Sequence, residues 1–157
     1  MAQTHTPALP LQPPGQGSFV ELQQSIPSQI SAISPFVNQL MHFIRNLRKA
    51  DGSEVDIELA LQEALANAVI HGNHEDVRKR VDVVCRCSIY GEVSITIRDQ
   101  GQGFNTGTIP DPTVSENRLS THGRGVYLMQ SLMDEIHYEE GGAILYMRKK
   151  ANASSPK

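Results

Sequence analysis

The sequence predicts a two-layer α/β (α+β) sandwich, in which helices cover one face of a mostly antiparallel sheet. Two segments before residue 72 carry apolar residues at intervals of three and four, as amphipathic helices do. Two strand-like runs, 81–89 and 92–98, are separated only by Tyr90-Gly91, which indicates a tight hairpin. Together with a further helix and strand, these segments give the expected order β, α, α, β, β, α, β.

The length and composition suit one globular domain between two short tails. A chain of 157 residues, 39% of them hydrophobic, can bury a core without disulfides or metal. Four of the nine prolines fall within residues 1–17, which indicates a flexible tail. We therefore expect a domain over residues 18–150 and a polar tail over 151–157.

The first two elements of this domain are a strand and a helix. Residues 19–26 alternate imperfectly between apolar and polar side chains and precede Pro27, which favours a strand. A helical pattern follows, in which Pro35 either introduces a kink or starts the helix. Asp51-Gly52 provides its stop signal. Its apolar positions are Ile30, Ile33, Val37, Leu40, Met41, Ile44 and Leu47.

A second helix is expected from about Glu54 to Ile70. Ser53 and Asp56 resemble a capping box at its start, and Gly72 ends it.

After the hairpin, residues 105–122 are rich in Gly, Thr, Pro and Asp, and we expect them to form a mobile lid. Gly123-Arg124-Gly125 then opens a third helix, and residues 143–148 form the last strand. The apolar positions assigned to the third helix are Val126, Leu128, Met129, Leu132, Met133 and Ile136.

Several classes of function are disfavoured by composition. The net charge of -3 supplies no basic field for nucleic acid. No apolar run approaches the roughly 20 residues of a membrane span, and the first 14 residues do not resemble a signal peptide, so we expect a cytoplasmic protein. Cys85 and Cys87 would share one face of a strand, where reduced core thiols are favoured over a disulfide or a metal site.

The first candidate for chemistry is Asp99, which follows a strand and begins Asp99-Gln100-Gly101-Gln102-Gly103. An ionised carboxylate only accepts hydrogen bonds, so it can hold the exocyclic amine of adenine and would repel the carbonyl of guanine. Gly101 and Gly103 would allow a ligand to approach the backbone. Taken alone, this pattern is more typical of a hairpin or loop carboxylate.

The second candidate is the start of the third helix. Free N–H groups and the positive end of the helix dipole favour phosphate there, and Arg124 can add a charged contact. Glycines such as Gly123 and Gly125 also flank helix starts for steric reasons alone.

The third candidate is a polar stripe on the second helix, with Glu63, Asn67 and His71 at intervals of four. Asn67 offers a hard oxygen for Mg²⁺, and Glu63 can accept the proton of an attacking hydroxyl. A solvated helix face is the alternative. For His71 and His74, a capping or surface role is favoured over metal binding because Gly72 ends the helix between them.

Jointly, these three segments resemble the N, G1 and G2 boxes of the GHKL ATPases. Within that superfamily the chain looks like the anti-sigma-factor serine kinases, over roughly residues 18–150. The segments are Glu63 to Gly72, Asp99 to Phe104 and His122 to Met129, with Pro110-Asp111-Pro112 as a further shared feature.

The resemblance implies a Bergerat-fold domain that binds ATP with Mg²⁺ and phosphorylates a serine on an anti-sigma-factor antagonist. It also implies sequestration of a sigma factor when the antagonist is absent, and it is compatible with a homodimer. Glu63 would be the base, Asn67 the magnesium ligand and Asp99 the adenine-binding carboxylate. Gly101 and Gly103 would admit the adenine, and Gly123, Arg124 and Gly125 would hold phosphate.

One position departs from the family pattern. Relatives often place a threonine where this chain has Ala143, so a hydrogen bond near the adenine would be missing or made by water. An ATP-binding module that sequesters a partner without kinase activity remains the alternative function. A histidine kinase domain fits poorly, because residues 1–50 offer only His5 and His42 as phosphoacceptors.

Overall fold

The computed structural model describes residues 18–102 and 121–152. Gly103, most of the segment expected to be a lid, and nearly all of both expected tails lie outside the described residues. The elements are β1 Phe19–Pro27, α1 Ile30–Leu47, α2 Glu54–Asn67, β2 Arg80–Ser88, β3 Val93–Arg98, α3 Thr121–Leu132, β4 Glu135–Glu139 and β5 Ile144–Lys149.

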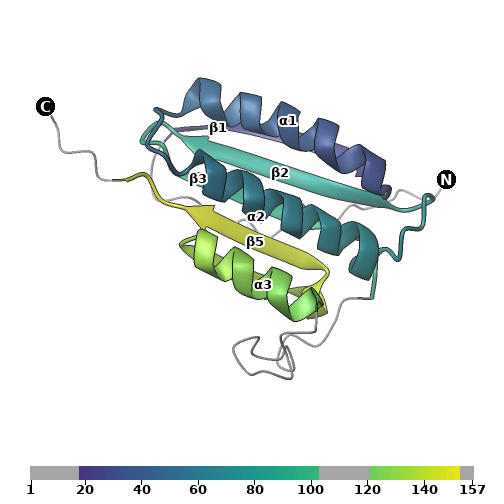
Figure 1. Ribbon diagram of the computed structural model, residues 1–157. Helices are drawn as coiled ribbons and strands as arrows, with labels where there is room; N and C mark the ends of the chain where they lie inside the picture. Colours follow the sequence, from purple (N-terminus) through teal and green to yellow (C-terminus); the bar gives the residue numbers. More distant parts are fainter. Residues whose placement is uncertain (1–17, 103–120, 153–157) are drawn as a thin grey trace, which may run out of the picture.

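The sheet has the order β1-β2-β3-β5-β4, and every neighbouring pair is antiparallel. The three helices lie side by side on one face of it, with α2 between α1 and α3 (Figure 1). This arrangement confirms the predicted two-layer fold class. No helix within the described ranges is long and apolar enough to cross a membrane.

The core lies between the helices and the inner face of the sheet. Alternate residues of β2 and β3 point inward and are buried, as a strand period of two requires. Cys85 and Cys87 are among them, and both are free and buried, which confirms their prediction as reduced core thiols. α1 contributes Leu40, Met41 and Ile44, each fully buried.

The segment from α1 to the start of α2 decides one open alternative and corrects one prediction. α1 begins at Ile30 and contains Pro35 in its second turn, so Pro35 does not start the helix. Ser53 makes no side-chain cap to α2, so the predicted capping box is wrong. Instead, the Ser53 hydroxyl donates to Asp51 Oδ1 at 2.5 Å and accepts from Arg48 Nη1 at 2.6 Å. Bonds to Asp51 and Arg48, two and five residues earlier, therefore replace the expected bond to the helix N-terminus.

The largest correction concerns β4, which the sequence pattern does not predict. α3 starts at Thr121, two residues earlier than expected, and ends at Leu132, so Ile136 is not helical. Ile136 follows Leu132 at a helical spacing, but it also alternates with Tyr138 on a strand. The local pattern therefore fits both a helix and a strand, since a five-residue edge strand has a weak local signal. Pairing with β5, in which Tyr138 lies opposite Leu145, makes this segment a strand.

Candidate functional site

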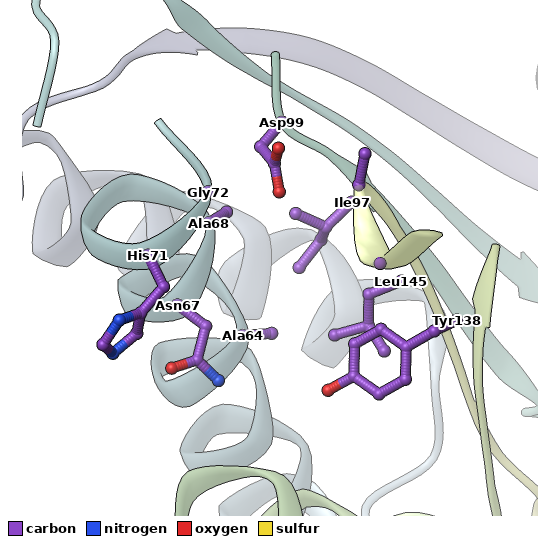
Figure 2. A pocket seen from close by; sticks show the side chains of 11 residues that line it. Ala64, Asn67, Ala68, His71, Gly72, Ile97, Asp99, Tyr138 and Leu145 are labelled. Carbon is purple, nitrogen blue, oxygen red and sulfur yellow. The ribbon is translucent and has the colours of Figure 1, made fainter. Parts of the chain in front are cut away.

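A hollow opens at the end of the sandwich where α2 and β3 finish, and β4 and β5 form its other side (Figure 2). Most of its walls are small or apolar, with a few polar groups among them, as is usual for small-molecule sites. The described residues that line it are Ala64, Asn67, Ala68, His71, Gly72, Ile97, Asp99, Tyr138, Gly142, Ala143 and Leu145.

Asp99 lies at the rim of this hollow because it directly follows the last residue of β3. Its N–H donates to the carbonyl of Ala143 at 3.0 Å, and its Oδ1 accepts the N–H of Gly101 at 2.8 Å. Burial raises the pKa of the Asp99 carboxyl, and the Gly101 hydrogen bond and the charges of Lys79 and His74 offset this only in part. The structure thus holds a partly desolvated acceptor against an apolar hollow.

Asn73 fixes the turn that carries Asp99. Its side chain is fully buried; Oδ1 accepts the N–H of Gln100 at 2.7 Å, and Nδ2 donates to the carbonyl of Arg80 at 3.0 Å. It therefore joins the end of the second helical segment to the turn after β3. Residue spacing does not reveal this role of Asn73, because its partners lie 7 and 27 residues away along the chain.

Gly72 and Gly101 bring these two turns into contact. A Cβ on Gly72 would lie 2.3 Å from Asp99 Oδ2, and a Cβ on Gly101 would lie 2.0 Å from the carbonyl oxygen of Gly72. Neither position leaves space for a side chain. Gly101, predicted from the motif to admit a ligand, therefore also has a packing reason to be glycine.

The first turns of α3 pack against the polar stripe of α2. A Cβ on Gly125 would lie 2.8 Å from Glu63 Oε2 and 3.5 Å from Asn67 Nδ2. Asn67 Nδ2 is buried and makes no hydrogen bond with any described residue. Gly123 and Arg124 belong to the same first turns of α3, and the structure describes no side chain there.

The segment that follows α2 is irregular. The helix does not simply end near Ile70 but continues as a π-helical turn over Ala68–Gly72. Such turns are rare and often occur at functional sites. The turn places His71 at the hollow, where its side chain is exposed, whereas His74 lies beyond it with a φ of 53°. No group of three or more metal-ligating side chains occurs in residues 18–102 and 121–152.

The structure thus brings most of the predicted residues to one end of the molecule. Asp99 and Asn67 line one hollow, and Glu63 and Gly125 lie beside Asn67. Chemically, this is an apolar slot with a hydrogen-bond acceptor at its rim and a carboxylate and an amide next to a helix start. That combination suits a ligand that carries a heterocyclic ring with a hydrogen-bond donor at one end and an anionic group at the other.

Comparison with known proteins agrees with this geometry. The chain belongs to the histidine kinase-like ATPase domain family, whose model matches residues 26–149. It is 32% identical over 126 residues to an anti-sigma F factor of Clostridium perfringens, covering 77% of this chain and 84% of the relative. It is 33% identical over 107 residues to the serine-protein kinase RsbW of Bacillus licheniformis, covering 62% of this chain and 65% of the relative. These relatives confirm the resemblance to anti-sigma-factor serine kinases.

A solved structure supports the fold. The crystal structure of the RsbU and RsbW domains of a Mycobacterium tuberculosis protein matches with a TM-score of 0.58 at 21% identity. The match covers 83% of this chain and 32% of that longer chain.

Proposed function

We propose that this protein is an ATP-dependent protein-serine kinase and an anti-sigma factor, which phosphorylates a serine on an antagonist protein and sequesters a sigma factor. The observation that carries the proposal is the packing of Glu63 and Asn67 against Gly125 in the first turns of α3, beside the hollow that Asp99 borders. Relatives named anti-sigma F factor and serine-protein kinase support the same activity.

The hollow suits the adenine of ATP. Ile97 and Leu145 provide apolar walls for a flat base, and Asp99 provides an acceptor for its exocyclic amine. The second oxygen of Asp99 lies against Gly72, so the carboxylate is held in one orientation. Guanine would present a carbonyl oxygen to this carboxylate, which favours ATP over GTP. Gly103, which lies outside the described residues, is assigned by its motif to the same binding site.

The groups beside α3 suit the phosphates and Mg²⁺. Magnesium takes oxygen ligands, few of them from the protein, and when bound it offsets phosphate charge. Asn67 fits this role because its amide Nδ2 has no described partner, so the side chain can present its oxygen without losing a hydrogen bond. Gly123, Arg124 and Gly125 are the proposed phosphate-binding residues at the helix start.

Glu63 is the proposed general base. It lies one helical turn before Asn67 and is half-buried, with Oε2 directed at the backbone of Gly125. In the transfer, the serine oxygen bonds to the γ-phosphorus, the bond from that phosphorus to the ADP oxygen breaks, and Glu63 takes the serine proton.

The remaining parts of the proposal concern location and assembly. We place the protein in the cytoplasm, with the antagonist and the sigma factor as its partners. A homodimer is compatible with this proposal. The domain is assigned to residues 18–150, with tails over 1–17 and 151–157.

Labelled ATP and the cognate antagonist test the activity. Glu63→Ala should abolish formation of phosphoserine, with nucleotide binding close to that of the wild type. Glu58→Ala is the matched control, because Glu58 lies on the same helix and pairs at the surface with Arg45. Phosphoserine formed by Glu63→Ala would remove Glu63 from this role. If sigma-factor regulation persists in Glu63→Ala but is lost in Asp99→Asn, the protein acts as an ATP-binding module instead.

A further inference from the structure

Tyr138 is a component of the hollow that no motif indicates, since it lies on the unpredicted strand β4. It pairs with Leu145 of β5, and its ring packs against the core. In Figure 2 the ring reaches from the strands toward α2 with its hydroxyl end leading, into the space bordered by Asn67 and Asp99. The side chain is therefore directed at the proposed ligand and not at the outer face of the sheet.

The hydroxyl is chemically distinctive in this position. Among the described lining residues, Tyr138 is the one that carries a hydroxyl; Ala143, just before β5, contributes only a methyl group. A tyrosine phenol is protonated at physiological pH, and burial raises the pKa of Tyr138 further, to about 12. It can therefore donate a hydrogen bond, which the carboxylate of Asp99 cannot do when ionised.

A purine nucleoside needs both kinds of partner. Its exocyclic amine donates, whereas its ring nitrogens and ribose oxygens accept. Asp99 meets the first requirement and leaves the second unmet. The apolar residues around Tyr138, such as Leu145 and Ile97, also suit a base or sugar and not a phosphate, which would lie toward Gly125.

We propose that Tyr138 contacts the adenosine part of bound ATP, with its ring against the nucleoside and its hydroxyl donating a hydrogen bond to it, and that this contact sets nucleotide affinity. This inference rests on the proposed ATP site. It makes β4, and not only the three sequence motifs, a source of nucleotide affinity.

Calorimetric titration of the full chain with ATP tests the contact. Removing only the hydroxyl, in Tyr138→Phe, should weaken binding roughly fivefold, the usual size of one hydrogen bond. Removing the ring as well, in Tyr138→Leu, should weaken it roughly thirtyfold. The losses should be the same with ADP, because the γ-phosphate is not involved.

Tyr146→Phe is the matched control. Tyr146 lies on β5 directly after Leu145, and its ring stacks on His137, 5.3 Å between centroids, on the other face of the sheet. This variant loses the same hydroxyl and should bind ATP like the wild type. Tyr138→Phe binding that equals or exceeds the wild type would overturn the inference. Tyr138→Phe decides the question if Tyr138→Leu does not fold.

A fluorescence measurement gives an independent readout. The chain contains no tryptophan, so Tyr138→Trp creates a single reporter in the hollow, and Tyr90→Trp creates one at the exposed hairpin. ATP should change the emission of the first and not of the second. An unchanged Tyr138→Trp signal in a variant that still binds ATP would contradict the contact. If the wild type itself binds no ATP, the proposed function fails and this inference fails with it.

Discussion

The two ends of the helix–sheet sandwich both hold polar side chains, yet they differ in how those groups are satisfied. At one end, between α1, α2 and the β2–β3 hairpin, lies what we term the Arg48 cluster, which consists of Arg48, Asp51 and Ser53. At the other end lies the hollow, with Asp99 and Asn67. The helix α2 runs from one end to the other (Figure 1).

The Arg48 cluster is closed on itself. Arg48 donates to the carbonyl of Gly91 at 2.6 Å, to Ser53 Oγ at 2.6 Å and to Asp51 Oδ2 at 2.8 Å. Burial alone would raise the pKa of Asp51, but hydrogen bonds from Ser53 and Asn152, together with the charge of Arg48, lower it to about 2. The ionised carboxylate of Asp51 is therefore stabilised in this environment.

The hollow has the opposite character. Burial raises the pKa of Asp99, and Asn67 Nδ2 is buried with no partner among the described residues. A polar group that is desolvated without compensation costs stability, and such groups are found where a ligand supplies the missing partner. The two ends therefore differ in whether their polar groups have hydrogen-bond partners within the protein, and not in the types of residue that they contain.

The largest expected effect is on the closed cluster. Arg48→Met should lower the free energy of unfolding by about 4 kcal/mol, because it leaves Asp51 and the Gly91 carbonyl without their buried partner. Nucleotide binding by the folded fraction should be unchanged. Urea denaturation measures the first effect and calorimetry the second. Arg45→Met, which removes an exposed ion pair made from the same helix, should cost less than about 1 kcal/mol. Equal losses in the two variants would show that the Arg48 cluster contributes no more to stability than an exposed ion pair.

A steric change at the site should rank second. Gly101→Ala places a Cβ 2.0 Å from the carbonyl oxygen of Gly72, and we expect a loss of about 3 kcal/mol together with loss of ATP binding. Gly52→Ala is the control at the other end, where φ is 85° and no atom lies within 4 Å, so only the conformational cost of about 1 kcal/mol applies. Thermal denaturation measures the loss of stability in both variants. A loss in Gly101→Ala no larger than that in Gly52→Ala would show that the two turns are not in contact.

Neutralising the carboxylates of Asp51 and Asp99 should change the free energy of unfolding in opposite directions. The folded pKa of Asp51 lies below its unfolded value of about 3.9, so its stabilisation is present above pH 4 and is lost as the pH falls toward 2. Asp51→Asn should therefore cost about 1 kcal/mol at pH 7, after allowance for solvent screening, and reduce acid sensitivity.

The folded pKa of Asp99 is raised, so its ionisation costs stability as the pH rises through that value. Asp99→Asn should stabilise the fold at pH 7 while weakening ATP binding. Unfolding curves between pH 2 and pH 8 would contradict the comparison if both variants moved in the same direction.

The smallest effect on stability is expected at Asn67. Because Nδ2 makes no described hydrogen bond, Asn67→Ala should change the free energy of unfolding by less than about 0.5 kcal/mol. Its effect on binding should be large, with Mg²⁺-dependent ATP binding reduced more than tenfold. Asn73→Ala offers the contrast: Asn73 is fully buried with both amide atoms bonded, so its loss should reduce stability clearly. A large stability loss in Asn67→Ala would assign that residue to the scaffold.

Residue spacing predicted the helices well because their signal is local. The apolar positions of α1, such as Leu40 and Ile44, repeat at the helical period and are buried. The β2–β3 hairpin was predicted for the same reason, since its turn contains Gly91 with a φ of 90°. β4 was missed because its five residues fit two periods: Ile136 continues the helical spacing of α3 and also alternates with Tyr138 as in a strand.

The site was predicted from motifs only in part. Asp99, Glu63 and Asn67 were recognisable from residue type and spacing, and the structure brings them to one end of the molecule. Asn73 and Tyr138 were not, since their significance comes from contacts with distant segments. Ser53 was misassigned because its hydroxyl bonds to Arg48 and not to the start of α2. The burial of Arg48 against the β2–β3 hairpin is not visible in the local sequence.

By itself, the amino-acid sequence determined the layered fold and the family motifs, because the periods and motifs that indicate them lie within short stretches of the chain. The contacts that require glycine at Gly72, Gly101 and Gly125 join segments far apart in the sequence, so only the tertiary structure reveals them. The tertiary structure alone decided strand β4, the closure of the Arg48 cluster and the lack of a described hydrogen-bond partner for Asn67 Nδ2 at the hollow. Hydrogen-bond satisfaction and desolvation are properties of a packed environment, and that environment exists only once remote segments have come together.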